Sequence, residues 1–143
     1  MTLDRPSILI TDDDPVARQT LREIFEPAGY RTLLAESGEQ AIDIVRDEDV
    51  HLALMDMHLP KLTGLETIHI VHQIKGIIPM ILISAESDDN LLKKALSANA
   101  FCVLAKPVSK NVIIYVVTRA LEKFFDRSNS GRLEQFPIDP RVW

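Results

Sequence analysis

Five short apolar runs alternate with five stretches of helical periodicity, and this alternation restricts the possible folds more than any other feature of the sequence. The apolar runs cover residues 8–11, 30–36, 50–56, 77–83 and 101–105. These lengths are typical of buried strands. Strands that alternate with helices form βαβ units, in which parallel strands are covered by helices on both faces of the sheet. The sequence therefore predicts an α/β fold, a doubly wound five-stranded parallel sheet with five helices.

Local signals indicate where several helices begin and end. Pro15 suits a first helical turn, and Pro27-Ala28-Gly29 breaks the pattern that follows it. Ser37 and Gln40 have the spacing of a capping box, and Ser109 is expected to be the N-cap of the last helix. The core stripe of that helix is predicted to be Ile113, Val116, Val117, Ala120, Leu121 and Phe124. Three further apolar residues, Val112, Tyr115 and Phe125, fall outside the stripe and predict an apolar outer face.

Composition and charge exclude several classes of protein. The 143 residues are 46% hydrophobic and 26% charged, which is the profile of one ordinary globular domain. A net charge of -5, with no run of Lys and Arg, argues against direct nucleic-acid binding. No uncharged apolar run reaches the roughly 18 residues of a membrane span, and the single cysteine, Cys102, lies in an apolar run that predicts a buried thiol. We expect a cytoplasmic protein with no direct contact to nucleic acid or membrane.

Polar residues follow or end four of the five apolar runs. They are Asp12, Asp13 and Asp14 after the first run, Asp56 at the end of the third, Ser84 after the fourth and Lys106 after the fifth. Ligands of doubly wound sheets bind at the carboxyl ends of the strands, so we expect these side chains to converge there. Clustered carboxylates repel one another unless a cation compensates them, and a set of oxygen ligands suits Mg²⁺. Phosphoryl transfer needs a nucleophile, a metal and further donors for the phosphoryl charge, and these residue types match those parts.

Each of these residues has a simpler structural interpretation when it is considered alone. The acids at 12–14 could cap a helix, and Asp56 could be a turn residue that bonds its own backbone. Ser84 could be a loop hydroxyl and Lys106 a solvated charge. Their agreement at separate strand ends favours a common site. The histidines have no metal-ligand pattern with cysteine and are expected at the surface; they are His51, His58, His69 and His72.

With these motifs, the chain resembles the receiver domains of two-component response regulators, of the single-domain chemotaxis-regulator type. The resemblance covers residues 6–126 and implies a flavodoxin-like sheet with strand order 2-1-3-4-5. It implies that Asp56 is the aspartate that accepts a phosphoryl group. Asp12 and Asp13 match the acidic pair that holds Mg²⁺, with Asp13 as the more direct ligand. Asp56 itself and the backbone carbonyl at His58 complete the metal contacts that the resemblance implies.

The resemblance extends to the residues around the phosphoryl group. Ser84 stands where the family has a Thr or Ser that bonds a phosphoryl oxygen. Lys106, which is followed by Pro107, matches the lysine that pairs with another oxygen. Pro60 and Gly64 match the spacing that follows the acceptor aspartate.

The chain departs from the family pattern at an aromatic switch position. Many receivers have Tyr or Phe three residues before the strand-five lysine, whereas this chain has Val103. Strand alternation would place Phe101 on the same side as Val103, where it could partly substitute for the missing ring. His58 and Glu86 stand at positions that tune the lifetime of the phosphoryl group in the family.

The resemblance also implies partners. A sensor histidine kinase or a histidine phosphotransfer protein would donate the phosphoryl group, and the surface of the fourth helix, fifth strand and fifth helix would signal to a downstream protein or form a homodimer. Residues 127–143 are expected to form a flexible tail. The chain is then a single-domain regulator or a fragment that lacks an output domain.

Two other functions are weighed against the phosphoacceptor. An interaction module could keep the fold without being phosphorylated, and Val103 favours this alternative. A phosphatase of the haloacid-dehalogenase type would also use a strand-end Asp with Mg²⁺. That class has a second Asp two residues later, where this chain has His58, so turnover of phosphate esters is not expected.

Overall fold

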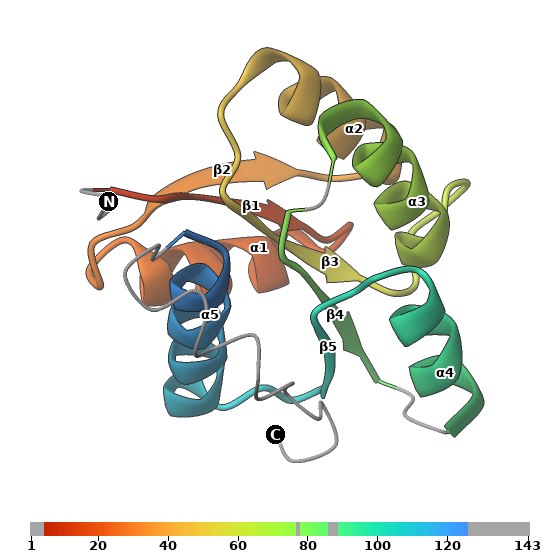
Figure 1. The fold of residues 1–143 in the computed structure, drawn as a ribbon. Coiled ribbons are helices and arrows are strands. Elements are labelled where there is room, and N and C mark those ends of the chain that lie inside the picture. The colour runs from red at the N-terminus through yellow and green to blue at the C-terminus, as the bar shows by residue number, and fades with distance from the viewer. Residues whose placement is uncertain (1–4, 77, 86–88, 126–143) are drawn as a thin grey trace.

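The computed structural model describes residues 5–76, 78–85 and 89–125, in which strands and helices alternate strictly (Figure 1). The strands are β1 (Ser7–Thr11), β2 (Arg31–Ala35), β3 (Leu52–Asp56), β4 (Met80–Ser84) and β5 (Cys102–Ala105). The helices are α1 (Pro15–Phe25), α2 (Gly38–Asp47), α3 (Gly64–Lys75), α4 (Asp89–Ser97) and α5 (Lys110–Phe125). No helix in these three segments is long and apolar enough to cross a membrane.

All five strands are parallel and lie in the order β2-β1-β3-β4-β5, so both the predicted fold class and the predicted order are confirmed. Helices α1 and α5 cover one face of the sheet, and α2, α3 and α4 cover the other (Figure 1). Every residue of β1, β3 and β4 is buried. This explains their nearly continuous apolar sequences, because a strand covered on both faces has no solvent side.

Two apolar clusters, one on each face of the sheet, make up the core. On the α1/α5 face, Ile8 and Ile10 pack with Phe25 and with the predicted stripe of α5 except Phe124. On the other face, Leu9 packs with residues of α2, α3 and α4. Cys102 belongs to the first cluster as predicted, and burial raises the pKa of its thiol to about 12, so the thiol stays protonated at neutral pH.

Side chains cap four of the helices, including the two whose caps the sequence predicts. The Ser37 hydroxyl accepts a hydrogen bond from Gln40 N at 3.1 Å, and Ser109 accepts one from Val112 N at 3.3 Å. The Gln40 side chain, however, accepts from Glu36 N and not from Ser37 N, so the predicted reciprocal box is shifted by one residue. A complete capping box, which the sequence analysis does not identify, starts α3 at Thr63.

The last helix differs from its prediction at its final turn. Phe124, assigned to the core stripe, is 36% exposed. Phe125, assigned to the outer face, is half-buried and packs edge-on against His51, with ring centroids 5.5 Å apart. The final turn of α5 therefore packs on the sheet and also on His51, the residue that precedes β3. Val112 and Tyr115 are exposed, as predicted.

Phe101 does not lie where strand alternation predicts. It precedes β5 and packs on the α1/α5 cluster, with its ring edge-on to Phe124 at a centroid distance of 6.3 Å. Val103 packs on the opposite cluster. The prediction that Phe101 could substitute for an aromatic residue at position 103 is therefore wrong, because the two side chains lie on different faces of the sheet.

Two of the four histidines are also less exposed than predicted. His51 is half-buried, and its Nδ1 accepts a hydrogen bond of 2.9 Å from Ser7 N. His72 is half-buried too, with Nε2 at 3.4 Å from the carbonyl oxygen of Ile78. Each imidazole ring thus contacts a backbone polar group at or near the start of a strand, the amide of Ser7 or the carbonyl of Ile78. His58 and His69 are exposed, as expected.

Candidate functional site

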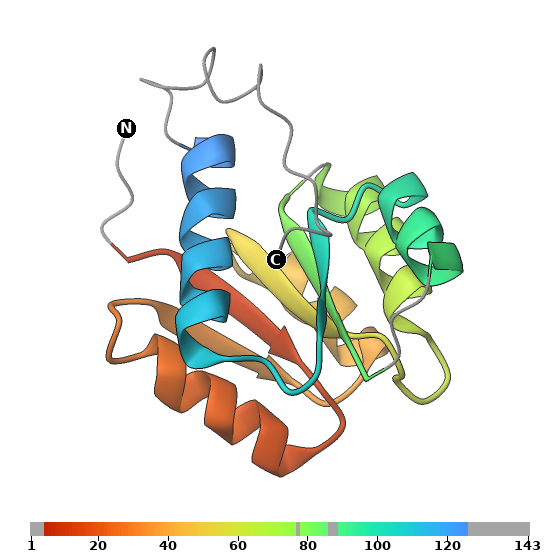
Figure 2. The ribbon, with the colours of Figure 1, turned by 90° about the horizontal axis from the view of Figure 1, so that it is seen from below.

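The polar residues singled out in the sequence gather at the carboxyl edge of the sheet, the edge to which all strand arrows point (Figure 2). Asp12 follows β1 directly, and Asp56 and Ser84 are the last residues of β3 and β4. Lys106 follows β5, and its backbone N donates to Ser84 O at 2.9 Å. Backbone hydrogen bonds between neighbouring strands thus continue to the point where these side chains leave the sheet.

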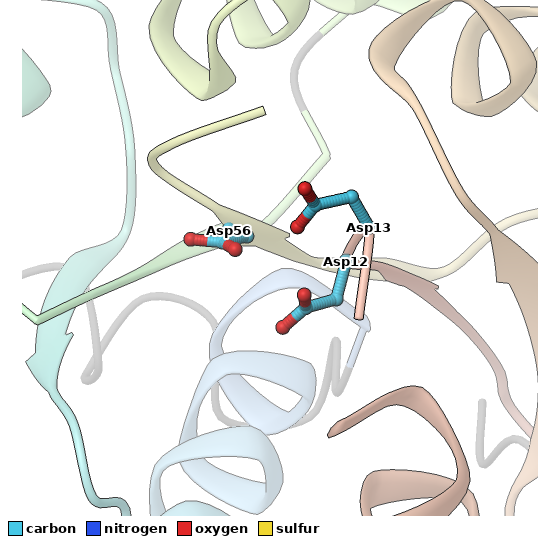
Figure 3. Close-up of side chains that lie close together, drawn as sticks. All are labelled: Asp12, Asp13 and Asp56. Atoms are coloured by element: carbon cyan, nitrogen blue, oxygen red, sulfur yellow. The ribbon is translucent and has the colours of Figure 1, made fainter. Parts of the chain in front are cut away.

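Three carboxylates lie close together at this edge. Asp12, Asp13 and Asp56 each offer a carboxylate oxygen, and these oxygens lie within 4.8 Å of one another (Figure 3). Asp12 is only 4% exposed and Asp56 only 6%, whereas Asp13 is exposed. Within the described residues, these three aspartates form the cluster of acidic, His or Cys side chains that could hold a metal ion. No histidine belongs to this cluster.

Backbone amides fix one oxygen of each buried carboxylate. Asp12 Oδ1 accepts from Asp14 N at 2.9 Å, and Asp56 Oδ1 accepts from His58 N at 3.2 Å. The other oxygens face Lys106, whose Nζ lies 3.4 Å from Asp56 Oδ2 and 3.6 Å from Asp12 Oδ2. The ammonium group therefore joins the ends of β1 and β3 from its position after β5.

The pKa values of this group reflect burial and neighbouring charge. Burial raises the pKa of Asp12, and the negative charges of Asp56 and Asp13 act in the same direction against the Asp14 amide and Lys106. For Lys106, partial desolvation works to lower the pKa, but Asp12 and Asp56 outweigh it and the pKa is raised. Lys106 is therefore charged at neutral pH, while Asp12 is held in an environment that disfavours its ionised form.

Glycine is required beside Asp56 for steric reasons. A Cβ atom on Gly64 would lie 2.6 Å from the backbone oxygen of Asp56 and 3.1 Å from the Cα of Met57. Gly64 N also donates to Met57 O at 3.2 Å. The first turn of α3 thus packs directly on the backbone that carries the candidate nucleophile, which gives the predicted Pro60 and Gly64 spacing a physical basis at Gly64.

The remaining candidate residues have different surroundings. Ser84 is fully buried at the end of β4, next to the strand that carries Asp56. The His58 side chain is exposed and its amide binds Asp56, while the metal contact expected of its carbonyl remains a prediction. Val103 is half-buried on the α2/α3/α4 cluster. Glu86 lies outside the described residues.

Two further residues at this edge hold the turn between β1 and α1. Asp14 is the N-cap of α1 and accepts from Val16 N at 3.0 Å, so the capping interpretation of the acids at 12–14 is confirmed for this residue. Arg18 donates from Nη1 to the backbone oxygen of Asp12 at 2.6 Å. An Asp directly before Pro15 is a recognisable cap signal, but no sequence pattern predicts which carbonyl a long side chain such as Arg18 reaches.

The carboxylate cluster fits a hard divalent cation. All of its donors are oxygens, which Mg²⁺ prefers, and two of them are buried carboxylates whose mutual repulsion a cation would relieve. Lys106 provides only partial compensation, with one positive charge opposite three negative ones. Asp13, on the exposed side, leaves the cluster open to solvent, as expected for an ion that keeps several waters.

Comparison with known proteins finds a matching family model and bacterial relatives. Residues 8–118 match the family model of the response regulator receiver domain. Sporulation initiation phosphotransferase F of Bacillus subtilis is 35% identical over 100 residues, which cover 70% of this chain and 81% of that protein. A cyclic di-GMP phosphodiesterase of Thermotoga maritima is 30% identical over 118 residues, which cover 80% of this chain and 31% of that protein.

The structural match supports the same fold. A receiver domain protein from Methanospirillum hungatei JF-1 has a TM-score of 0.80 at 24% identity, over 83% of this chain and 95% of that one. Several sequence relatives are considerably longer, since this chain spans 31% of the Thermotoga protein and 61% of response regulator RR06 of Streptococcus pneumoniae.

Proposed function

This chain belongs to the response regulator receiver family, and on that premise we propose that it is a phosphoacceptor switch in which Asp56 takes a phosphoryl group from a phosphohistidine. One observation supports the proposal above the others: the nearly buried Asp56 carboxylate lies beside the oxygens of Asp12 and Asp13 and within 3.4 Å of the Lys106 ammonium. A nucleophile held between candidate metal ligands and a cation is what phosphoryl transfer requires.

The proposed step is a displacement at phosphorus. An Asp56 carboxylate oxygen forms a bond to phosphorus, the bond from phosphorus to the donor's imidazole nitrogen breaks, and its electron pair leaves with the imidazole. The product is an acyl phosphate on Asp56. Lys106, already on Asp56 Oδ2, would pair with one phosphoryl oxygen, and the Ser84 hydroxyl would donate to another.

Asp12, Asp13, Asp56 and the carbonyl at His58 would hold Mg²⁺ in this proposal. The ion would supply neutralisation of charge on the phosphoryl oxygens. Asp12 would act on it partly through water, and a bound cation would offset the burial and the charges of Asp56 and Asp13 that raise the pKa of its carboxyl.

As a receiver domain the chain is a signalling module, and we infer that it acts only on its own Asp56. The haloacid-dehalogenase type of phosphatase needs a second Asp where this chain has the exposed His58. The proposed location of the chain is the cytoplasm, and residues 6–126 are the proposed receiver unit. A sensor histidine kinase or a histidine phosphotransfer protein is the proposed donor. The name phosphotransferase carried by the Bacillus subtilis relative is consistent with transfer of a phosphoryl group.

The proposed output surface is formed by α4, β5 and α5. Leu96 on α4 is 44% exposed, and Val112 and Tyr115 on α5 are 38% and 51% exposed. Burial of these side chains against a downstream protein or a second copy of the chain would be favourable. Movement of Ser84 toward the phosphoryl group would be passed to this surface through β4 and β5, which are hydrogen-bonded neighbours.

The decisive experiment measures intact mass after incubation with acetyl phosphate and Mg²⁺. The wild type is expected to gain the mass of one phosphoryl group, because one nucleophile is proposed. Asp56→Asn is expected to gain none. Asp43→Asn is a matched control, since Asp43 is an exposed acid on α2 that pairs with Arg46, and it should be labelled normally.

The same measurement separates the alternative function. An interaction module that works without phosphorylation would show no gain of mass in the wild type while it still bound its partner. That alternative draws its support from Val103, whereas the retained carboxylates, Ser84 and Lys106 favour the phosphoacceptor. A wild type that is not labelled, under conditions in which a phosphorylated receiver control is, would contradict the proposed function.

A further inference from the structure

We propose that Arg18 is a positioning residue for the magnesium site, an inference that rests on the function proposed above for that site. Its guanidinium Nη1 donates a hydrogen bond of 2.6 Å to the backbone oxygen of Asp12. Arg18 therefore acts on the backbone that carries two of the three candidate metal ligands, and not on the phosphoryl group itself.

The start of α1 brings Arg18 to this position. Asp14 caps the helix, and Arg18 N donates to Asp14 O at 3.1 Å in the first helical turn. Side chains on a helix incline toward its N-terminus, so the long Arg18 side chain lies back over the turn between β1 and α1. It is half-buried there, which limits the number of conformations open to it.

The bonded oxygen determines the orientation of the next residue. It belongs to the peptide group that joins Asp12 to Asp13, and a peptide group is planar, so fixing its carbonyl also fixes the amide of Asp13. Asp12 is independently held by its amide, which donates to Ala35 O at 3.1 Å, and by its carboxylate, which accepts from Asp14 N. The bond from Arg18 adds a third constraint, because it holds the carbonyl oxygen of the Asp12–Asp13 peptide group itself.

Asp13 depends on this constraint more than Asp12 does. Asp13 is exposed, so packing does not hold its carboxylate, yet it lies toward those of Asp12 and Asp56 (Figure 3). If the peptide between residues 12 and 13 could rotate, the Asp13 carboxylate would leave the cluster for much of the time. Bonds that orient metal ligands from the next shell typically affect metal affinity by about 10- to 100-fold.

Charge alone predicts the opposite effect for Arg18. A guanidinium near three carboxylates repels a divalent cation, so a purely electrostatic role means that loss of Arg18 strengthens Mg²⁺ binding. Positioning means that its loss weakens Mg²⁺ binding. The sign of the change therefore separates the two effects in one measurement.

The test titrates Mg²⁺ into the full chain by calorimetry. Arg18→Met keeps the stem without the donors and is expected to raise the Kd for Mg²⁺ about 10-fold. Arg18→Lys keeps a charged donor and is expected to recover part of this loss. Arg22→Gln is the control, because Arg22 lies on the same helix with the same charge but pairs with Glu26 at 3.3 Å. It should leave the Kd unchanged.

A second measurement uses the metal-free protein. Exchange of the Asp13 and Asp14 amide hydrogens, followed by NMR, is expected to become faster in Arg18→Met than in wild type, while amides of β3 keep their protection. At saturating Mg²⁺ the initial rate of labelling by acetyl phosphate is expected to return to within about twofold of wild type, since only metal affinity is impaired.

The possible outcomes are distinct. Mg²⁺ binding in Arg18→Met that equals or exceeds that of wild type would overturn the positioning role, as would unchanged amide exchange in the turn. If Arg18→Met does not fold, Arg18→Lys decides: a raised Kd for Mg²⁺ together with faster exchange of the Asp13 and Asp14 amides supports the proposal, and a Kd equal to or below that of wild type contradicts it. Failure of the wild type to bind Mg²⁺ would instead contradict the proposed function.

Discussion

At the scale of single residues, Asp12 combines two conditions that disfavour a charged carboxylate. It is 4% exposed, and the carboxylates of Asp56 and Asp13 are its neighbours. The Asp14 amide and Lys106 compensate only in part, so the pKa of Asp12 is raised. The ionised Asp12 side chain therefore lowers the stability of the folded protein. Such a cost is expected where the charge serves to bind a ligand and does not stabilise the fold.

Replacement of Asp12 by Asn is therefore expected to stabilise the metal-free protein at pH 7. The folded state has the higher pKa, so this group contributes stability below its ordinary value of 3.8 and loses it as pH rises through the folded value. Asn removes the charge and can still accept from Asp14 N. In EDTA we expect the Tm of Asp12→Asn to exceed that of wild type by roughly 3 °C at pH 7, or about 1 kcal/mol. The difference should shrink toward pH 4.

Thermal unfolding by circular dichroism measures this difference, with Asp43→Asn as the control. Asp43 is exposed on α2, so its replacement should leave the pH dependence unchanged. Saturating Mg²⁺ should reverse the order of the two Tm values, because the variant loses a ligand. A metal-free Asp12→Asn that is less stable than wild type at pH 7 would show that the Lys106 pairing outweighs burial.

The sequence predicts which residues meet at the site better than it predicts how they are held. Asp12, Asp56, Ser84 and Lys106 end or follow strands, and strand ends converge in any parallel sheet. The contact from Arg18 to Asp12 O depends on where α1 begins, which Pro15 predicts correctly, and on one side-chain conformation. No sequence pattern predicts that conformation, so this contact was found only in the structure.

At the scale of elements, α3 determines where Asp56 lies as much as β3 does. The capping box of Thr63 and Glu66 starts the helix at Gly64, and that glycine lies against the Asp56 backbone. The loop between them is further closed by the bond from Gly64 N to Met57 O. A change at this contact would shift the proposed nucleophile, Asp56, without altering any charged group.

Gly64→Ala is expected to impair both stability and phosphorylation. The new Cβ would lie 2.6 Å from Asp56 O and 3.0 Å from Leu82 Cδ2, so backbone must move. We expect a loss of about 2 kcal/mol in the free energy of unfolding, as for an overpacked core. We also expect labelling by acetyl phosphate to be at least about 10-fold slower, since small misplacements of reacting groups are costly. Urea denaturation and mass spectrometry measure the two effects.

Gly76→Ala is the matched control for this contact. Gly76 has φ +75° and ends α3, but a Cβ there meets no atom within 4 Å. Its replacement should cost about 1 kcal/mol from the left-handed backbone alone and should leave the labelling rate unchanged. Equal labelling rates in the two variants would mean that the Gly64 contact does not position Asp56.

Element boundaries were the less accurate part of the sequence prediction, for identifiable reasons. The fourth strand begins at Met80, later than predicted, because Pro79 has no N–H to donate at the start of the ladder. Phe101 precedes β5 and is therefore free of its alternation, so its ring packs with Phe124 on the other face. Apolar content identified both runs correctly but could not assign their first residues.

At the scale of the whole molecule, the strand order places the site at the centre of the sheet. β1 and β3 are adjacent. β2 lies beside β1 at one edge of the sheet, and β4 and then β5 lie on the other side of β3. The carboxylates at the ends of β1 and β3 thus belong to strands in the middle of the core, and Lys106 connects them to β5. An ion held there would join segments that are far apart in the sequence.

Mg²⁺ is therefore expected to stabilise the whole fold and not just one loop. A ligand that binds only the folded state stabilises it by RT ln(1 + [L]/Kd), which is about 1.4 kcal/mol at a concentration of 10 Kd. For a chain of this size this corresponds to a rise in Tm of roughly 4 °C. The rise should disappear in EDTA, which removes the ion. Asp13→Asn should abolish most of it, whereas Glu39→Gln should not, because Glu39 is an exposed acid of the neighbouring α2 that does not belong to the cluster. Differential scanning calorimetry with and without Mg²⁺ measures the shift, and an equal shift in both variants would place the ion outside the carboxylate cluster.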